Sequence, residues 1–267
     1  MSADALIHAF RLPEQALVAQ RIAKKLLLQQ GAPTAADKRL INDTLDELWW
    51  QAALKPATVG VPAQGDVLEL ALVSAQLRPA ASAAQARRLL QLIHRAIPYP
   101  VLLVAHPLPG AAAGALLSLA HKRASLGEAG QWVLAEAAQT HAFDPARPSA
   151  DEAAFLASLA LERMPRSALV DLAALYQGYA DRVTALAVAQ LTGCFAAPGS
   201  AAQAAAQREA LAERQRVQHE LAAARGAANR ARQLNRRVEL NLLVQRLQGR
   251  VRQIDGTLNP EPHRPTP

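Results

Sequence analysis

The sequence contains almost no cysteine, the residue that forms disulfides and supplies thiolate ligands to metal ions. Cys194 is the only cysteine among 267 residues, which excludes intramolecular disulfides and metal sites built from several thiolates. No stretch reaches the roughly 18 consecutive apolar residues of a membrane-spanning helix, and the first residues lack the apolar run of a secretion signal. We therefore expect a cytoplasmic protein that is not embedded in a membrane.

Familiar catalytic and nucleotide-binding motifs are also absent from the sequence. It has no glycine-rich phosphate loop, no Gly-x-Ser-x-Gly motif and no cysteine and histidine pairs at ligand spacing. His106 and His121 could face each other across a hairpin, but a metal site there needs a third ligand, for which the sequence offers no candidate. We expect neither a bound metal ion nor a cofactor.

The sequence is rich in alanine, and helical periodicity runs through much of it. Hydrophobic residues make up 51% of the chain, but many of them are alanine, which favours helix and buries little surface. The pattern predicts an α+β fold for residues 1–125, with a small, mainly antiparallel sheet and helices on one face. After this domain we expect a helical segment over residues 126–198. A long C-terminal coiled-coil helix is expected over residues 201–258.

Within the first domain, residues 34–52 predict a helix that Thr34 caps. Residues 57–61 and 67–77 predict two strands joined by the turn Gln64-Gly65-Asp66.

Residues 85–106 then change their hydrophobic period. Helical spacing runs to Ala96, the prolines at 98 and 100 stop the helix, and Val101–Val104 continue as an apolar run. We therefore expect a helix, a buried strand over 101–105 and a partner strand over 116–120.

The middle segment has weaker signals. Residues 132–137 are compatible with a strand or a short helix. Helical periodicity begins at Ala150 and again at Ser167, and Gly193 with Pro198-Gly199-Ser200 predicts a boundary before the C-terminal helix.

Residues 201–258 predict one long helix. Its apolar residues alternate steps of four and three with one shift near residue 240, which is typical of a coiled coil. Such a stripe needs a covering helix, so we expect an oligomer or a hetero-complex, with folding back onto the chain's own domain as the alternative. The residues expected to mediate association are Val238, Leu240, Leu247, Val251 and Ile254. Residues 259–267 are expected to be disordered.

Positive charge is concentrated in this last helix. Residues 1–200 contain 17 basic and 16 acidic residues, a balance of +1, whereas residues 201–258 contain 11 arginines and 5 acidic residues, a balance of +6. No aromatic residue follows Phe195, so stacking on bases cannot contribute, and we expect phosphate contacts that read no sequence. The arginines expected to bind nucleic acid are Arg225, Arg230, Arg232, Arg236, Arg237, Arg246, Arg250 and Arg252.

A nuclease is the alternative interpretation. The order helix, strand pair, helix, strand is that of restriction-endonuclease-like cores, and Asp66 and Glu69 are expected on the second strand. Such sites hold a divalent metal ion with acidic residues and place a lysine two residues after one of them. Ala71 stands at that position here, which favours a degenerate site over an active one.

Several segments together resemble an uncharacterised bacterial family, domain of unknown function 4391. They are RIAKK (21–25), ADKRLINDTLDELWWQAALKPAT (36–58), DVLELALVSAQLRP (66–79) and LLQLIHRAIPYPVLLVAH (89–106). The resemblance implies a genomic setting beside helicases and DNA methyltransferases in restriction-like or anti-phage defence clusters, and it implies no activity. We expect a non-enzymatic accessory or scaffolding protein of such an assembly, for which a helicase or a DNA methyltransferase is a candidate partner.

Overall fold

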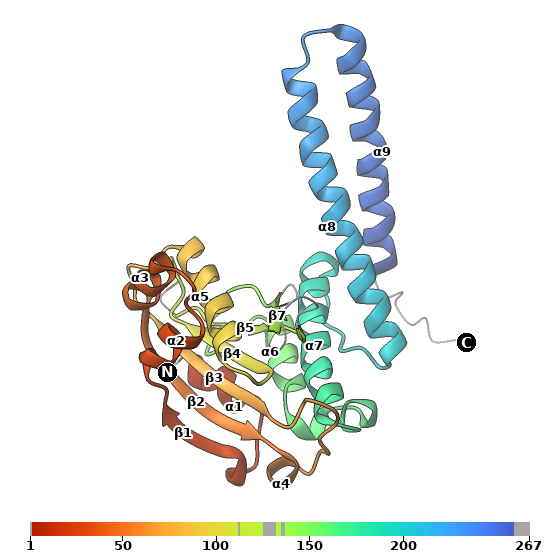
Figure 1. Cartoon of the computed structure of the whole chain (residues 1–267). Coiled ribbons are helices and arrows are strands. Elements are labelled where there is room, and N and C mark those ends of the chain that lie inside the picture. Colours follow the sequence, from red (N-terminus) through yellow and green to blue (C-terminus); the bar gives the residue numbers. More distant parts are fainter. Residues whose placement is uncertain (1, 112, 125–131, 135–136, 259–267) are drawn as a thin grey trace, which may run out of the picture.

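The structure, a computed structural model, describes residues 2–111, 113–124, 132–134 and 137–258. The described chain forms an α+β body, from which two long C-terminal helices project as an arm (Figure 1). The α+β class predicted from the sequence is confirmed. None of the helices described here combines the length and the apolar character needed to cross a membrane.

A six-stranded sheet forms the centre of the body. Its order is β1-β2-β3-β4-β5-β8, and all neighbours are antiparallel except β3 and β4. The strands are β1 (Leu17–Arg21), β2 (Leu45–Leu54), β3 (Leu70–Leu77), β4 (Val101–His106), β5 (Leu116–Leu119) and β8 (Ala138–Gln139). Two further strands, β6 (Lys122–Ala124) and β7 (Trp132–Leu134), pair with each other. Residues 135 and 136, part of the segment predicted as strand or short helix, lie outside the described residues.

Helices cover both faces of this sheet, which corrects the expectation of helices on one face. Leu70 and Leu72 point into one core cluster, whereas Ala71 and Val73 point into the other. Buried strands with uninterrupted apolar runs need cover on both sides. One face packs against α1 (Ser2–His8), α6 (Ala150–Ser158) and α7 (Leu172–Thr192), and the other against α2 (Lys24–Gln30), α3 (Ala35–Thr44) and α5 (Ala83–Ala96).

The helix predicted over residues 34–52 is wrong beyond Thr44. The chain turns there into β2, which pairs with β1 on one side and β3 on the other. Register shifts between Leu45 and Glu47 and between Trp50 and Ala52 interrupt the strand's alternation. As a result Leu45 and Leu48, three residues apart, enter the same core cluster, which produces helix-like spacing in a strand.

Residues 57–61 are also not a strand. Pro56–Val59 form a short helix, α4, which ends at Gly60 with a positive φ of 69°. The turn at residues 64–67 is confirmed by an isolated bridge between Gln64 and Val67. Three short 3-10 turns complete the body: Glu14–Ala16, Leu161–Arg163 and Arg166–Ala168.

The predicted change from helix to buried strand is confirmed in α5 and β4. Ser82 accepts a hydrogen bond from the Gln85 backbone N–H, and the Gln85 side chain accepts one from Ser82 N–H, which forms a capping box. β4 then pairs with β3 in parallel and with β5 in antiparallel fashion.

The C-terminal segment is helical as expected, but it forms two helices rather than one. They are α8 (Ala201–Arg230) and α9 (Leu234–Leu258), and we call this pair the arm. The two helices run antiparallel, so the residues 231–233 that join them lie at the end farthest from the body (Figure 1).

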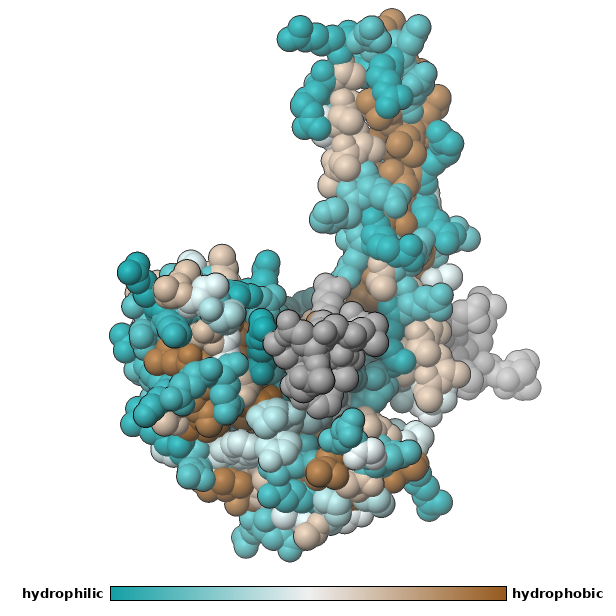
Figure 2. All heavy atoms as spheres, viewed as in Figure 1, coloured by the Kyte–Doolittle hydropathy of each residue, from teal (hydrophilic) through white to brown (hydrophobic). Residues whose placement is uncertain are grey.

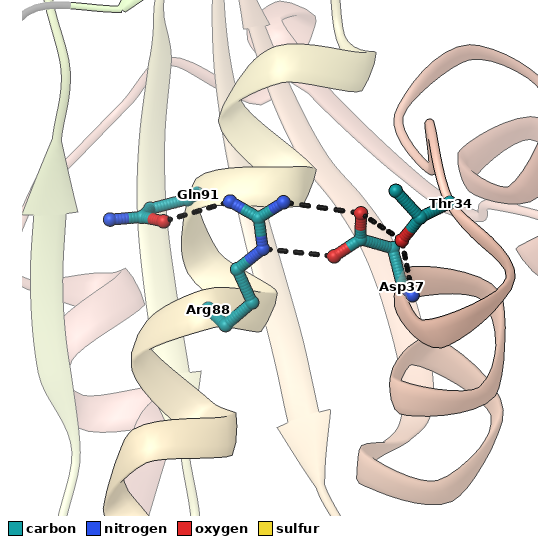
Figure 3. A network of polar contacts seen from close by, with 4 residues as sticks. All are labelled: Thr34, Asp37, Arg88 and Gln91. Carbon is teal, nitrogen blue, oxygen red and sulfur yellow. Dashed lines mark hydrogen bonds and ion pairs between the residues drawn. The ribbon is translucent and has the colours of Figure 1, made fainter.

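An ion pair links α3 to α5 at the surface of the body (Figure 3). Arg88 donates from Nε to Asp37 Oδ1 (2.9 Å) and from Nη2 to Asp37 Oδ2 (3.1 Å). Thr34 caps α3 as predicted, since its hydroxyl accepts from the Asp37 backbone N–H and donates to the Asp37 carboxylate. The Arg88 guanidinium holds the pKa of the buried Asp37 carboxyl below its usual value.

We predict that Arg88→Ala lowers the free energy of unfolding by about 1.5–3 kcal/mol at neutral pH, because it leaves a buried carboxylate without its cation. A depressed carboxyl pKa stabilises the fold above the unfolded-state pKa of the carboxyl, and this contribution is lost as the pH falls through the folded-state value. Urea denaturation of both proteins between neutral pH and pH about 3 should therefore show the difference shrinking with acid. Arg87→Ala, at an exposed neighbour, is the matched control; an equal loss in it would contradict the account.

Candidate functional site

The half of the arm farther from the body concentrates positive charge. Residues 221–246, which we call the distal half, contain six arginines and one glutamate. The remainder, residues 201–220 and 247–258, is the proximal half, and it contains the other arginines and acidic residues of the arm. The two halves differ in what their arginines contact.

Three arginines of the proximal half, Arg208, Arg214 and Arg250, form ion pairs that join the helices to each other or to the body. Arg214 Nε lies 2.5 Å from Asp255 Oδ1, which links α8 to α9, and Arg208 pairs with Asp181 of α7. A buried cluster of Val188, Val217, Ile254 and Leu258 lies beside these pairs. This end of the arm is therefore held against α7 by both apolar packing and charge.

Arginines of the distal half are mostly unpaired. Arg236 lies 2.9 Å from Glu239. Within the described part of the chain no carboxylate pairs with the other five, which are Arg225, Arg230, Arg232, Arg237 and Arg246. All six side chains are exposed, so their guanidinium groups are available to an anionic partner.

The structure brings together six of the eight arginines predicted to bind nucleic acid. The other two, Arg250 and Arg252, are also exposed but lie in the proximal half. Arg250 is engaged there by Glu213 of α8 at 3.6 Å and by Gln253. Arg252 has no carboxylate partner among the described residues either, but it lies apart from the other six arginines. We therefore take the distal half, which stands clear of the body (Figure 1), as the candidate site.

Most residues predicted to mediate association lie in the seam between α8 and α9. Leu240 and Ile254 are buried, and Leu247 and Val251 are partly buried. Among the described residues, the stripe of α9 is thus covered by α8 and, near Ile254, by Val188 of α7. Only the contact with α7 is the folding back onto the chain's own domain that was considered as the alternative, and association with another chain stays a prediction. Val238 is the exception, because it is exposed.

The structure leaves other apolar residues of α9 exposed, including Leu242, which the heptad pattern had placed in the apolar stripe. They are Leu234, Leu242 and Leu243. The spacing of Leu234, Val238 and Leu242 by four residues was the sequence signal for a second apolar face, separate from the seam.

The carboxylates considered for a nuclease site do not converge. Asp66 is exposed in the turn and Glu69 precedes β3, so neither lies on the strand as expected. Glu69 is buried and its carboxylate lies 3.1 Å from Lys55 Nζ. Over the described ranges, no group of three or more histidine, cysteine, aspartate or glutamate side chains could hold a metal ion.

His106 and His121 do not face each other across the β4–β5 hairpin. The register pairs Ala105 with Leu116 and Leu103 with Ser118, which places the two histidines at opposite ends of the strand pair. The His121 ring packs instead against the Tyr176 ring at 5.3 Å.

A histidine and a serine meet inside the body. His94 Nε2 of α5 lies 3.0 Å from Ser118 Oγ of β5, which also accepts a hydrogen bond from Gln139. Burial lowers the pKa of His94 to about 3, so the imidazole is neutral at physiological pH. Both side chains are fully enclosed, and a serine that no substrate reaches is a core contact rather than a nucleophile.

Lys122 is a second titratable group held inside the body. Its ammonium donates to the carbonyl oxygens of Ile97 and of Tyr99 (2.6 Å), at the stop after α5. Burial lowers the pKa of Lys122 to about 8. The amine therefore satisfies the backbone carbonyl groups that follow the end of α5.

One family model matches the chain. Its description is "Domain of unknown function (DUF4391)", and the match covers residues 10–251. No curated protein and no solved structure matches the chain. The match extends over the body and most of the arm.

We predict that the burial of Lys122 makes the free energy of unfolding rise with pH. A lysine whose folded-state pKa is about 8 and whose unfolded-state pKa is 10.5 binds more protons when unfolded, so the free energy of unfolding increases between these two pH values. Lys122→Met removes this dependence. Urea denaturation of both proteins from pH about 7 to about 10.5 should show the native protein gaining stability relative to the variant; a constant difference would contradict the burial of this amine.

Proposed function

The chain belongs to the DUF4391 family, and from this premise we propose that it is a non-enzymatic accessory protein that contacts nucleic-acid backbones through the distal half of the arm. The observation that carries the proposal is the set of five exposed arginines without a carboxylate partner among the described residues. Their position away from the body leaves room for an extended polyanion (Figure 1).

The chemistry of these side chains favours phosphate over bases. Arginine pairs with phosphate through two parallel N–H groups, and its charge does not depend on pH in the physiological range. The arm has no aromatic residue that could stack on a base, so affinity comes from the release of counterions. Such binding is non-specific, with a Kd of the order of micromolar at physiological salt.

The arm also supports an accessory role because it separates two surfaces. Its proximal half is fixed on α7 by Arg208 and the Val188 cluster, while its distal half is free to meet other molecules. We propose that the protein works in the cytoplasm within a DNA-directed assembly of the restriction-like or anti-phage type, in which a helicase or a DNA methyltransferase supplies the activity. The genomic setting that the family resemblance implies supports this assignment.

We predict that replacing Arg230, Arg232, Arg236 and Arg237 with glutamine weakens binding to every duplex sequence alike. The slope of log K against log salt should flatten by about 0.9 for each phosphate that the variant no longer neutralises, as measured by fluorescence anisotropy with labelled DNA over a range of salt concentrations. The matched control removes four exposed arginines of the body, Arg78, Arg87, Arg95 and Arg147, and should keep the native slope. An unchanged slope in the arm variant, or an equal change in the control, would contradict the proposal.

A metal-dependent nuclease is the second candidate, favoured by the order α3-β2-α4-β3-α5-β4, in which α4 is a single short turn, and by the buried Glu69 before β3. We predict that the purified protein leaves linear and supercoiled DNA intact in Mg²⁺ or Mn²⁺, because Ala71 stands where such sites require a lysine. Gel analysis of both substrates measures this. Cleavage by the native protein that Glu69→Ala abolishes would overturn the non-enzymatic assignment.

A further inference from the structure

The outer side of α9 carries an apolar ridge made of Leu234, Val238 and Leu242. These side chains are 65%, 51% and 53% exposed. Val238 precedes the buried Leu240 by two residues, which is about 200° around a helix, so the ridge faces away from the seam with α8. Figure 2 shows hydrophobic side chains among hydrophilic ones on the α9 side of the distal half.

The spacing of the ridge matches one mode of helix packing. Residues at steps of four form a continuous row that fits the groove of a second helix, with the two axes crossing at about −50°. The seam with α8 uses steps of three and four instead, so the ridge is a separate packing surface. Single exposed leucines are ordinary on proteins, but three in one row form a contiguous patch.

The charges around the ridge determine what can cover it. Arg237 and Arg246 lie within about one turn of the row. The one carboxylate of the distal half, Glu239, is already bound by Arg236 at 2.9 Å. A second copy that docked ridge against ridge would therefore bring arginines against arginines, and its distal half would supply no free carboxylate.

Nucleic acid and lipid fit the ridge less well than a protein does. A phosphate backbone offers no apolar surface to cover leucine side chains. Helices that lie on membranes present a broad apolar face of tryptophan, phenylalanine and leucine, whereas the ridge is a single row of three aliphatic residues and the arm contains no tryptophan or phenylalanine. An amphipathic helix with acidic flanks would cover the leucines and pair with the arginines at the same time.

We propose that the apolar ridge binds an acidic amphipathic helix of a partner protein. This goes beyond the proposed nucleic-acid contact, because it concerns a protein partner, and it does not depend on whether the arginines also bind nucleic acid. The ridge supplies the apolar contact, while Arg237 and Arg246 select the sign of charge on the incoming helix.

The experiment uses the full chain and three synthetic helical peptides of about 20 residues. The first peptide has leucine on one face and glutamate elsewhere, the second has lysine in place of glutamate, and the third has the composition of the first with its leucines scattered around the helix. The ridge variant replaces Leu234, Val238 and Leu242 with glutamine. The matched control replaces Leu68 and Val170, each 63% exposed, with glutamine. Binding is followed by fluorescence anisotropy, and circular dichroism reports folding.

The proposal predicts that only the first peptide binds the native chain well and that the ridge variant loses at least about tenfold in this affinity, while the control keeps it. The ridge variant should also keep the native affinity for duplex DNA, so a failure of nucleic-acid binding is seen separately in the native protein. Equal binding of the first and third peptides would overturn the proposal. So would a native dimer in sedimentation equilibrium, or binding to anionic phosphatidylserine vesicles, that the ridge variant abolishes.

Discussion

The apolar seam between α8 and α9 is the contact on which the arm depends. Two packed helices bury only one stripe of each. Here Val217 of α8 packs in one cluster with Ile254 of α9, and Leu221 of α8 and Leu240 of α9 are buried as well. Every other side of the distal half is therefore free of the described part of the body, which lies at the opposite end of the arm (Figure 1). The same constraint that holds the helices together thus leaves arginines free for an anionic partner and leaves an apolar ridge uncovered.

The sequence predicted the elements whose local signals agree with their tertiary environment. The capping box at Ser82, the prolines after Ile97 and the apolar run of β4 all favour the structure that forms. β2 could not be predicted in this way. Its two register shifts place Leu45 and Leu48 on one face, and the strand exists because β1 and β3 pair with it, which a single segment does not reveal.

The candidate site was predictable in its charge but not in its geometry. The excess of arginine after residue 200 is visible in the composition, but the break at residues 231–233 contains neither glycine nor proline, so no local signal ended the helix there. The shift of the heptad near residue 240 lies within α9, so it did not mark the break either. The arginines of the proximal half pair across helices, as Arg214 does with Asp255. The spacing of residues in the sequence does not predict such contacts.

The central claim is that the distal half is the surface that contacts nucleic acid. The chemical reactivity of individual arginines tests this claim most directly. The full chain is treated with an arginine-specific dicarbonyl reagent, with and without saturating duplex DNA at low salt, and modification is quantified at each arginine by mass spectrometry. The account predicts that DNA protects the six distal arginines, Arg225 to Arg246, while Arg78, Arg87 and Arg95 of the body react as before. Protection of the body arginines, or none in the distal half, would contradict it.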